Sequence, residues 1–435
     1  MLELGTDAMS FLAVESGMKH WLAGEDRAAC VAYVDTRTAW VAACGPISSA
    51  AERARIALEF VEAASAQGRR ACFFATGRLD SDRLSHLLIG EQPIFRPADW
   101  LRELPRRRRL REQLRRARAK GVRARRVQTE EVAEESALRR EVDRLGSEWL
   151  AGRHLEPMGF LVAVEPFHHP EEHRYFVAEH RGRVIAFLSA VPIGPRRAWL
   201  IEDVFRAPDA PNGTTETLLH ALMHDVADAE YVTAGLAPLS GPVIPPLRVA
   251  RWLSRPLFDF AGLRAFRERM HPQAWEPVWL AYPRGQSTTL HLIDSLRAFA
   301  RGSLTTFAAR SLLRHPSGLP WALALPLPPW TLALAWLVVV HRAYLLGFPR
   351  MELALWVAFD ALLFFVLVRV AMRPRRARLL TAASFATVDA ALSVGHLVWV
   401  GAGTTLLQAS LRGVATAAPV AGALLLGWAT TRTSV

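Results

Sequence analysis

The sequence predicts an α/β fold with two mixed-sheet units, followed by an all-α region in a membrane. The order strand, strand, helix, strand occurs twice before about residue 300, which suggests a duplicated unit. Basic charge is concentrated in one short stretch between the two units, and the chain turns strongly apolar after about residue 315. With 435 residues, the chain is long enough for two or three domains.

The first unit is expected within residues 1–100. Its first two strands are separated by a short turn, and a Gly-Pro pair at 45–46 then breaks the chain. The apolar spacing that follows is typical of a helix, which should end at Gly68. The expected elements are strands at 28–34 and 39–44, a helix at 51–67 and a strand at 71–75.

Residues 101–126 are expected to link the two units through a basic helix. Between Arg102 and Arg126 there are thirteen basic and two acidic residues, which account for about eleven of the twelve net positive charges. Like charges four residues apart repel, so we expect phosphate groups of RNA or lipid to bind this helix; a solvated surface helix is the alternative. Its buried face is expected to be Leu110, Leu114 and Ala117. The candidate tRNA- or phosphate-binding residues are Arg107, Arg108, Arg111, Arg115 and Arg118.

The second unit is expected within residues 127–300. A helix precedes a hairpin that turns at Arg181 and Gly182, and a strand, a helix and a short strand follow. The expected elements are a helix at 134–150, strands at 175–179, 184–191 and 198–204, a helix at 214–229 and a strand at 231–235.

Residues 315–435 are expected to form about four transmembrane helices. The apolar stretches are close to the roughly 20 residues that cross a bilayer, although Pro326, Pro328 and Pro329 interrupt the first. The Arg-rich link at 373–378 should be cytosolic, which with four spans places the preceding units in the cytosol too. A buried helical bundle is the alternative. The stretches are residues 320–346, 351–372, 379–400 and 404–430.

The candidate catalytic residues are Asp203 and Arg206. They end a predicted strand and should place an acid and a base near one sheet edge, with a structural salt bridge as the alternative. The next loop opens a helix N-terminus, which suits an anion or a carbonyl group, so Asn212 and Gly213 are candidate substrate-binding residues.

Other groups of polar residues give weaker indications of function. Ser240 lies in a turn-rich loop at 235–241 that is not a Gly-x-Ser-x-Gly elbow, so a serine hydrolase is not predicted. The histidines at 168, 169, 173, 220 and 224 lack a metal-binding pattern, and neither a metal nor a cofactor is expected. Three cysteines and the absence of a visible signal peptide indicate a reducing compartment.

The sequence resembles the aminoacyl-phosphatidylglycerol synthases, the lysyl- or alanyl-phosphatidylglycerol transferases also called multiple peptide resistance factors. The resemblance covers about residues 5–285 and rests on five segments in the family's order and spacing. These segments are Arg115–Gly121, Asp203–Arg206 with Ala210–Thr214, Gly235–Gly241, Leu263–Arg267, and Trp275–Pro277 with Leu280–Pro283.

This resemblance implies two tandem acetyltransferase-like (GNAT) domains that face the cytosol at the bacterial inner membrane. Such enzymes move an amino acid, of the Lys or Ala type, from aminoacyl-tRNA to a hydroxyl of an anionic glycerolipid such as phosphatidylglycerol, and are linked to antimicrobial peptide resistance. The family's catalytic area falls on Asp203 and Arg206, and its basic Lys-x-Lys pair falls on Arg267 and Arg269. Ser240 and Glu276, within matching segments, are further substrate-binding candidates. Better-known members carry membrane helices, including a lipid flippase, before the transferase, whereas this chain has its apolar stretches after it.

Two alternatives remain open. An acyl-CoA-dependent N-acyltransferase tethered to the membrane would use the same fold, but its glycine-rich pyrophosphate turn is replaced here by Asp209-Ala210-Pro211-Asn212-Gly213, in which Pro211 lacks an N–H donor. A non-enzymatic, membrane-anchored RNA- or lipid-binding module would explain the basic helix and the apolar tail. It would leave Asp203 and Arg206 without a role.

Overall fold

The computed structural model describes residues 2–23, 28–152, 158–162, 164–254, 258–314, 319–324, 326–340, 346, 350–372, 376–401 and 405–432. The chain divides into two compact units, the sheet unit (residues 1–307) and the helical unit (residues 308–435). Each is described by itself below.

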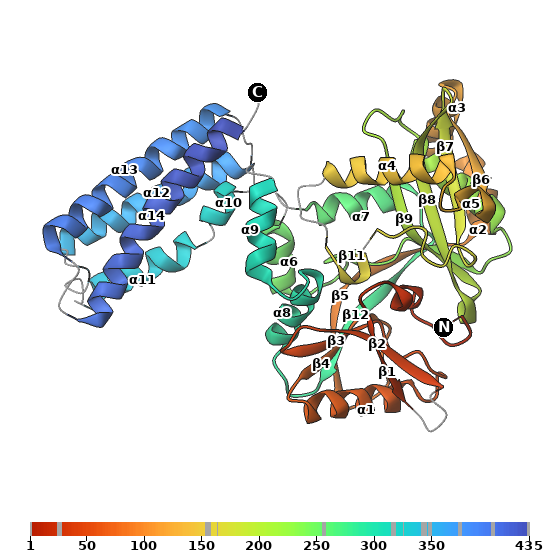
Figure 1. Ribbon diagram of the computed structural model, residues 1–435, viewed down its shortest axis with the longest axis horizontal. Coiled ribbons are helices and arrows are strands. Elements are labelled where there is room, and N and C mark those ends of the chain that lie inside the picture. The colour runs from red at the N-terminus through yellow and green to blue at the C-terminus, as the bar shows by residue number, and fades with distance from the viewer. Residues whose placement is uncertain are drawn as a thin grey trace. The chain divides into compact units, whose positions relative to one another are not determined.

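The sheet unit is built on one twelve-stranded mixed sheet (Figure 1). The order across it is β1-β2-β3-β4-β12-β5-β10-β9-β8-β7-β6, with β11 beside β5. The strands are β1 (Lys19–Ala23), β2 (Ala29–Asp35), β3 (Ala39–Ala43), β4 (Arg70–Thr76), β5 (Leu84–Phe95), β6 (Arg123–Val127), β7 (Arg174–His180), β8 (Arg183–Ile193), β9 (Ala198–Arg206), β10 (Tyr231–Thr233), β11 (Ala237–Pro238) and β12 (Ala274–Pro283).

The predicted duplication is confirmed by the strand pairing. In the first repeat, β2 pairs antiparallel with β3, and α1 (Arg53–Ala66) then crosses over to place β4 parallel to β3. In the second repeat, β8 pairs antiparallel with β9, and α5 (Thr214–Asp225) places β10 parallel to β9. Parallel neighbours need such a crossover, and the predicted helices supply it. The predicted α/β class with mixed strand pairing is therefore correct.

The two repeats share their sheet rather than forming two separate ones. The long strand β5 pairs with β10 at Ile94 and Phe95, which joins the repeats. β12 follows both repeats in the sequence but lies between β4 and β5, antiparallel to both. The expected segments 1–100 and 127–300 thus contribute neighbouring strands to one sheet. Neither β5 nor β12 was among the predicted strands.

Helices cover both repeats of the sheet. α4 packs on β8 and β9, whereas α3 packs against α5. The helices of the sheet unit are α1 and α5, given above, α2 (Pro97–Glu103), α3 (Arg108–Ala119), α4 (Ala137–Ala151), α6 (Pro245–Leu253), α7 (Phe260–Arg269) and α8 (Thr288–Phe299), and α9 (Leu304–Arg314) crosses into the helical unit. Short 3-10 helices are η1 (Ser10–Val14), η2 (Leu104–Arg106), η3 (Thr129–Val132), η4 (Phe160–Val162) and η5 (Gly194–Arg196).

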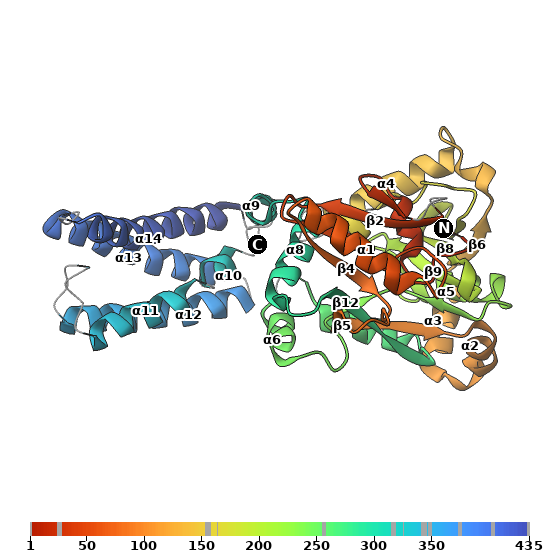
Figure 2. The ribbon, with the colours of Figure 1, turned by 90° about the horizontal axis from the view of Figure 1, so that it is seen from below.

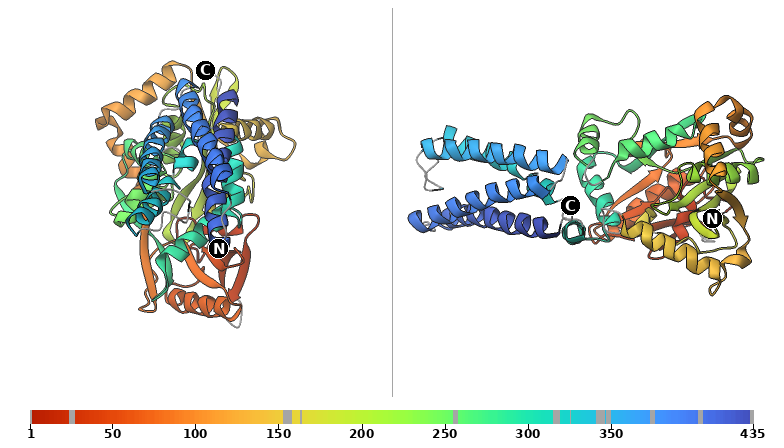
Figure 3. Two further views of the ribbon diagram at one scale, coloured as in Figure 1. Left: turned by 90° about the vertical axis from the view of Figure 1, so that its left-hand side faces the viewer. Right: turned by 90° about the horizontal axis from the view of Figure 1, so that it is seen from above.

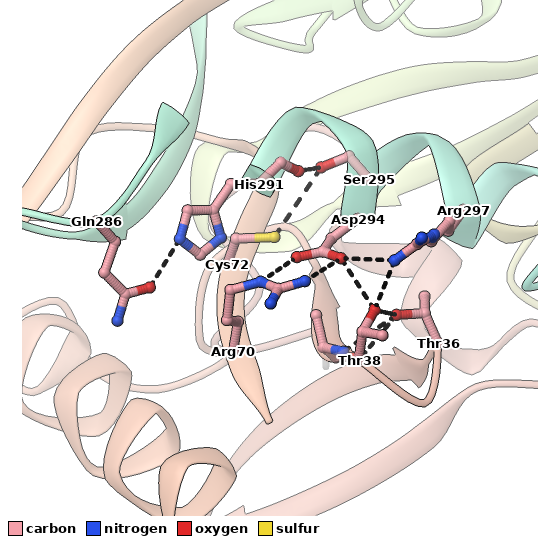
Figure 4. A network of polar contacts seen from close by, with 10 residues as sticks. Thr36, Thr38, Arg70, Cys72, Gln286, His291, Asp294, Ser295 and Arg297 are labelled. Carbon is pink, nitrogen blue, oxygen red and sulfur yellow. Dashed lines mark hydrogen bonds and ion pairs between the residues drawn. The ribbon is translucent and has the colours of Figure 1, made fainter. Parts of the chain in front are cut away.

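A buried ionic network anchors α8 to the first repeat (Figure 4). The carboxylate of Asp294 is fully buried and accepts two hydrogen bonds from Arg70, at 2.7 and 2.8 Å, and one from Thr38 at 3.0 Å. At the next position of α8, the hydroxyl of Ser295 contacts the Cys72 thiol at 3.9 Å. All three hydrogen bonds to this carboxylate come from β4 or the β2–β3 turn, so this network holds α8 against the sheet; Arg297 of α8 also lies 3.7 Å from it.

The helical unit contains three described helices long and apolar enough to cross a membrane, at residues 351–371, 376–400 and 406–431. A fourth crossing, at the first predicted stretch, stays a prediction. There the chain forms two short helices, because prolines at 326, 328 and 329 interrupt it; α11, with 13 residues, extends only about 20 Å. The helices are α10 (Leu319–Ala324), α11 (Leu327–Val339), α12 (Arg350–Met372), α13 (Arg376–Val400) and α14 (Leu406–Arg432).

Within this unit, α11 lies beside α12 and α13 lies beside α14, as Figures 2 and 3 show. Leucine and alanine side chains pack together between these helices, for example Leu367 of α12, Leu379 of α13 and Leu426 of α14. The first half of the predicted Arg-rich link, residues 373–375, lies outside the described residues.

Candidate active site

A bulge in β9 brings two consecutive acidic residues to one point of the sheet. The pairing of β8 with β9 shifts register between Leu188 and Ala190, so that Glu202 and Asp203 both lie opposite Ser189. The hydroxyl of Ser189 accepts a hydrogen bond from the Asp203 amide at 3.1 Å and donates one to the Glu202 carboxylate at 3.3 Å. The bulge therefore fixes the backbone on which the candidate catalytic acid stands.

A buried histidine orients Glu202. Nε2 of His173 lies 2.7 Å from the Glu202 carboxylate, and Nδ1 lies 2.9 Å from the carbonyl of His169. The ring stacks on Tyr175 at 5.3 Å between ring centroids. Because a carbonyl and a carboxylate are both acceptors, a proton must lie between His173 and Glu202 for both contacts to be hydrogen bonds.

The N-terminal segment packs against the residues around Glu202. Phe11 in η1 packs edge-on against the ring of His173, and the carbonyl of Val14 lies 2.9 Å from Nε2 of His168. Just after η1, the Ser16 hydroxyl donates to Glu165 at 2.5 Å. Residues from the first 20 of the chain therefore complete a site whose other members lie in the second repeat.

Three buried polar atoms at this point have no hydrogen-bond partner among the described residues. They are a carboxylate oxygen of Glu15, a carboxylate oxygen of Asp203 and the hydroxyl of Tyr175. Their residues are 9 %, 8 % and 1 % exposed, so bulk water does not compensate them. Unpaired buried groups of this kind are costly and are a feature of ligand sites.

Two acids of this site, Glu15 and Asp203, hold their protons unusually tightly. Burial, followed by the charges of Glu202, Glu165 and Asp203, raises the pKa of Glu15 from 4.5 to about 9. Burial and then the Glu202 charge also raise the pKa of Asp203 well above 3.8. We name Glu15, Glu165, Glu202 and Asp203 the acidic cluster. A cation entering this cluster would lower these pKa values and restore the carboxylates.

Arg206 does not join this cluster. From Asp203 to Arg206 the strand is regular, and residues three apart in a strand leave opposite faces of the sheet. The guanidinium of Arg206 donates to the carbonyl of Ala210 at 3.1 Å. Among the described residues there is no ion pair between Asp203 and Arg206, so the expectation that they share one sheet edge as acid and base, and its salt-bridge alternative, are both wrong.

The loop before α5 is closely covered by the basic helix. Gly213 has a φ of +94°, and a Cβ there would lie 2.5 Å from the carbonyl oxygen of Gln113 and 3.0 Å from Cβ of Ala117, both in α3. Only glycine fits this approach. Asn212 beside it is exposed. The turn in which an acyl-CoA enzyme would hold pyrophosphate is thus packed against protein backbone.

The remaining candidates lie apart from the acidic cluster. Ser240 is buried, and its hydroxyl bonds only backbone, the amide of Glu91 at 3.0 Å and the carbonyl of Ala237 at 2.7 Å. Glu276 accepts hydrogen bonds from Gln92 at 3.0 Å and Arg196 at 3.2 Å. No described contact links either residue to Asp203.

The two arginines of the Arg-x-Arg pair have different surroundings. Arg267 donates to the carbonyl of Gly235 at 2.9 Å, and burial lowers its pKa to about 10, which leaves it protonated at neutral pH. Arg269 is exposed, with its guanidinium 5.7 Å from the ring of Phe266. No described hydrogen bond or ion pair joins them to Arg206.

The charges of α3 are partly compensated within the protein. Arg107 pairs with Glu103 and donates to the carbonyl of His271 at 3.0 Å, and Arg111 donates to the carbonyl of Pro105 at 2.8 Å. Arg115 and its neighbour at 116 both pair with Glu112. The predicted uncompensated repulsion is therefore wrong for Arg107, Arg115 and Arg116, which pair with acids, whereas Arg111 has no ion pair among the described residues. Arg108 and Arg118 are exposed, and among the described residues they have no hydrogen bond or ion pair. Leu110 and Ala117 are buried as predicted, and Leu114 is half-buried.

Sequence reasoning missed five residues of this site: Glu15, Glu165, His173, Tyr175 and Glu202. The signal for Glu202 was present, because two adjacent acids within an otherwise apolar strand break the alternation and indicate a bulge. The other four come from distant segments, and only the fold brings them together.

Comparison with known proteins identifies the family. The sequence model of the family described as "Phosphatidylglycerol lysyltransferase, C-terminal" matches residues 2–282. A phosphatidylglycerol lysyltransferase of Bacillus subtilis (strain 168) is 26 % identical over 170 residues, which are 36 % of this chain and 19 % of that protein. The match therefore takes in about a fifth of the length of that relative.

Two solved structures resemble the sheet unit. The C-terminal domain of a lysylphosphatidylglycerol synthetase from Agrobacterium fabrum has a TM-score of 0.58 and 23 % identity, covering 69 % of this chain and 95 % of that one. The structure of L-PGS from Bacillus licheniformis has a TM-score of 0.57 and 20 % identity, covering 68 % and 93 %. At these identities the two structures show a shared fold.

Together with the long apolar helices, the family match indicates a membrane protein. Because the family model covers more than half of the sequence, the chain belongs to the phosphatidylglycerol lysyltransferase C-terminal family, a family of lipid-modifying enzymes.

Proposed function

We propose that this protein transfers an aminoacyl group, of the lysyl or alanyl type, from aminoacyl-tRNA to a hydroxyl of phosphatidylglycerol. The observation that carries this proposal is the acidic cluster, in which Glu15 and Asp203 each have a buried oxygen without a described hydrogen-bond partner, beside the equally unpartnered hydroxyl of Tyr175. An aminoacyl group carries an ammonium, and a lysyl group carries two. An ammonium is the charge that this cluster lacks.

In this proposal the acidic cluster holds the donor's ammonium. Burial raises the pKa of the carboxyls of Glu15 and Asp203 in the empty site; the entering cation lowers it, so that the carboxylates accept its N–H groups. The hydroxyl of Tyr175 lies at the same point. Binding through the ammonium places the adjacent ester carbonyl at the edge of the cluster, next to β9.

The reaction exchanges one ester for another. The lipid hydroxyl oxygen attacks the carbonyl carbon, the bond from that carbon to the tRNA ribose oxygen breaks, and the hydroxyl proton passes to the leaving ribose oxygen. The two esters are similar in energy, so most of the rate advantage comes from holding both substrates together. Asp203 orients the lipid hydroxyl or the ammonium, since a carboxylate is a weak base for an alcohol.

Basic side chains hold the two polyanions. Arg108 and Arg118, exposed on α3, contact tRNA phosphates. Positive charge for the lipid phosphate comes from Arg206 of β9 and from Arg267 and Arg269 of α7. Asn212, on the loop before α5, is exposed and remains a candidate contact for either substrate.

The same proposal gives the protein a place in the cell. It is a multi-pass protein of the bacterial inner membrane, and its sheet unit faces the cytosol, where charged tRNA is found. The long apolar helices support the membrane anchorage.

An acyl-CoA-dependent N-acyltransferase is less well supported. The backbone of α3 approaches Gly213 so closely that the pyrophosphate turn of such an enzyme has little room. The acidic cluster would also repel the phosphates of coenzyme A.

A lipid assay tests the proposal. Purified full-length protein, phosphatidylglycerol vesicles and tRNA charged with each radiolabelled amino acid in turn should yield a labelled lipid on thin-layer chromatography. Ribonuclease treatment of the tRNA and Asp203→Ala should each abolish the product, whereas Asp209→Ala, an exposed acid outside the cluster, should leave it unchanged. Labelled product from acetyl-CoA without tRNA would contradict the proposal and favour the N-acyltransferase.

A further inference from the structure

The helical unit contains a cavity of about 490 Å³ between its helices. This volume is typical of small-molecule sites in proteins. Most of the lining is leucine, alanine, proline and tryptophan from α11 to α14. The polar lining residues are Asp360, Asp389, Ser393, His396, Arg412 and Thr416. We name this space the bundle cavity.

Two of its acids stand at the middle of membrane-length helices. Asp360 is the eleventh of the 23 residues of α12, and Asp389 is the fourteenth of the 25 residues of α13. They are 5 % and 4 % exposed. In a helix that crosses a bilayer the midpoint lies in the hydrocarbon, where a carboxylate is costly unless it has a partner.

The described residues give these acids only neutral partners. Asp360 accepts a hydrogen bond from Trp330, and Asp389 accepts one from Ser393, one helical turn along α13. One carboxylate oxygen of Asp389 is buried without any hydrogen-bond partner among the described residues. The two carboxyl groups are also close enough to repel each other. The middle of the bundle cavity therefore lacks a cation.

Basic side chains lie toward one end of the same cavity. Arg412 in α14 is 7 % exposed and donates to the carbonyls of Val400 and Gly401, at 3.4 and 2.8 Å, where α13 ends. His396 follows Asp389 by seven residues, which places both on one face of α13. The cavity thus offers negative groups at its middle, basic groups near the end of α13 and apolar walls between them.

We propose that the bundle cavity is an intramembrane binding site for a phospholipid whose headgroup carries a primary ammonium. The ammonium lies between Asp360 and Asp389, the phosphate lies toward Arg412, and acyl chain packs along the apolar walls. This inference goes beyond the proposed transfer reaction and does not depend on it. The ligand is either an ordinary aminophospholipid or an aminoacylated lipid, and both have the same recognition chemistry.

A primary ammonium fits this site better than a smaller cation. It has three N–H donors, enough for both carboxylates and the hydroxyl of Ser393. A Mg²⁺ or Ca²⁺ ion requires about six oxygen ligands, more than these three side chains supply. A proton would neutralise one acid but would leave the volume and the basic end without a function.

Native mass spectrometry of the purified full-length protein tests this proposal. The protein in detergent is offered equal amounts of phosphatidylethanolamine, lysyl-phosphatidylglycerol, phosphatidylglycerol and phosphatidylcholine. We expect at least one of the two amine-bearing lipids to be retained about tenfold or more over the other two, as the loss of one charge-assisted contact implies. Preference for lysyl-phosphatidylglycerol alone identifies an aminoacylated ligand, and preference for phosphatidylethanolamine alone or for both identifies an aminophospholipid site.

The double variant Asp360→Asn with Asp389→Asn should lose this preference, and Glu352→Gln, an exposed acid on the same helix, should keep it. A second measurement needs only the wild-type protein. A hydrophobic carbodiimide should label Asp360 or Asp389, and the retained amine-bearing lipid should protect them, as read by peptide mass spectrometry. Equal retention of all four lipids, or labelling that no amine-bearing lipid reduces, would overturn the proposal.

Discussion

Two buried carboxyl groups of the sheet unit have opposite environments. Asp294 receives three hydrogen bonds, two of them from the guanidinium of Arg70 with which it forms an ion pair, so its charge is stabilised where it stands. Asp203 is nearly as buried, but one of its oxygens has no partner among the described residues, and burial raises its pKa. The environment of Asp294 is typical of a structural residue, and that of Asp203 is typical of a ligand-binding residue.

Removing the structural carboxylate should destabilise the protein. Asp294→Ala leaves Arg70 without its partner, and because that arginine is about a third exposed we expect a loss of about 2 kcal/mol in the free energy of unfolding. Chemical denaturation of the full chain in detergent measures this. The matched control is Asp82→Ala, an exposed acid, which should change the stability little. An unchanged unfolding midpoint for Asp294→Ala would contradict the assignment.

The raised pKa of Glu15 predicts a pH dependence of stability. Between pH 4.5 and about 9 the folded protein keeps a proton on Glu15 that the unfolded chain has lost. The free energy of unfolding therefore falls as the pH rises through this range, by up to about 1.4 kcal/mol per pH unit. Glu15→Gln, which cannot ionise, should flatten this slope, whereas the exposed control Glu62→Gln should not. A slope that is the same in all three proteins would show that Glu15 titrates normally.

At the scale of elements, regular patterns predicted regular structure. The paired strands and crossover helices of both repeats were predictable because their apolar spacing is continuous, as in α1 and β8. The strands β5 and β12 were not predictable, because they pair with each other across the 178 residues that lie between them in the sequence. In addition, neither strand shows a clear alternation of apolar and polar residues. The bulge at Glu202 also escaped prediction, because it is set by the pairing with β8.

The exposed arginines of α3 should bind tRNA through phosphate contacts. The double variant Arg108→Ala with Arg118→Ala should weaken tRNA binding and lower the slope of log affinity against log salt by about two, one for each lost contact. Filter binding over a range of salt concentrations measures this. Arg102→Ala on α2, an exposed arginine paired with Asp99, is the control and should keep the wild-type slope. A double variant with the wild-type slope would exclude α3 from the tRNA site.

At the scale of the whole molecule, the number of membrane crossings determines which side each part faces. Three crossings would put the sheet unit and the start of α13 on opposite sides of the membrane, and four would put them on the same side. The positive charges at Arg376 and Arg378 favour the cytosol, as does tRNA for the sheet unit. Both conditions hold together only when the segment of α10 and α11 also crosses.

Cysteine accessibility in cells tests this topology. Single cysteines introduced at Ala377 and at Ser303, in a background without the three native cysteines, should both be protected from a membrane-impermeant maleimide. A cysteine at Thr405, which precedes α14, should be labelled from outside. Labelling at Ala377 together with protection at Ser303 would mean three crossings and a periplasmic link.

The candidate site shows where sequence reasoning ends. Asp203 was predicted and stands in the acidic cluster, because a buried acid in an apolar strand is conspicuous. Its expected partner Arg206 was misplaced, because spacing in a strand was read without its alternation of faces. Glu15 could not be predicted, since 187 residues separate it from Glu202 and only the folded N-terminal segment brings them together.

The central claim is that the acidic cluster recognises the ammonium of the aminoacyl group. The most direct test compares single-turnover transfer to phosphatidylglycerol from lysyl-tRNA and from lysyl-tRNA acetylated on its amines. The wild-type protein should use the acetylated donor at least about a hundredfold more slowly, since two charge-assisted contacts are lost. Asp203→Asn, with the cluster already weakened, should discriminate much less. Equal rates from both donors in the wild-type protein would contradict the claim.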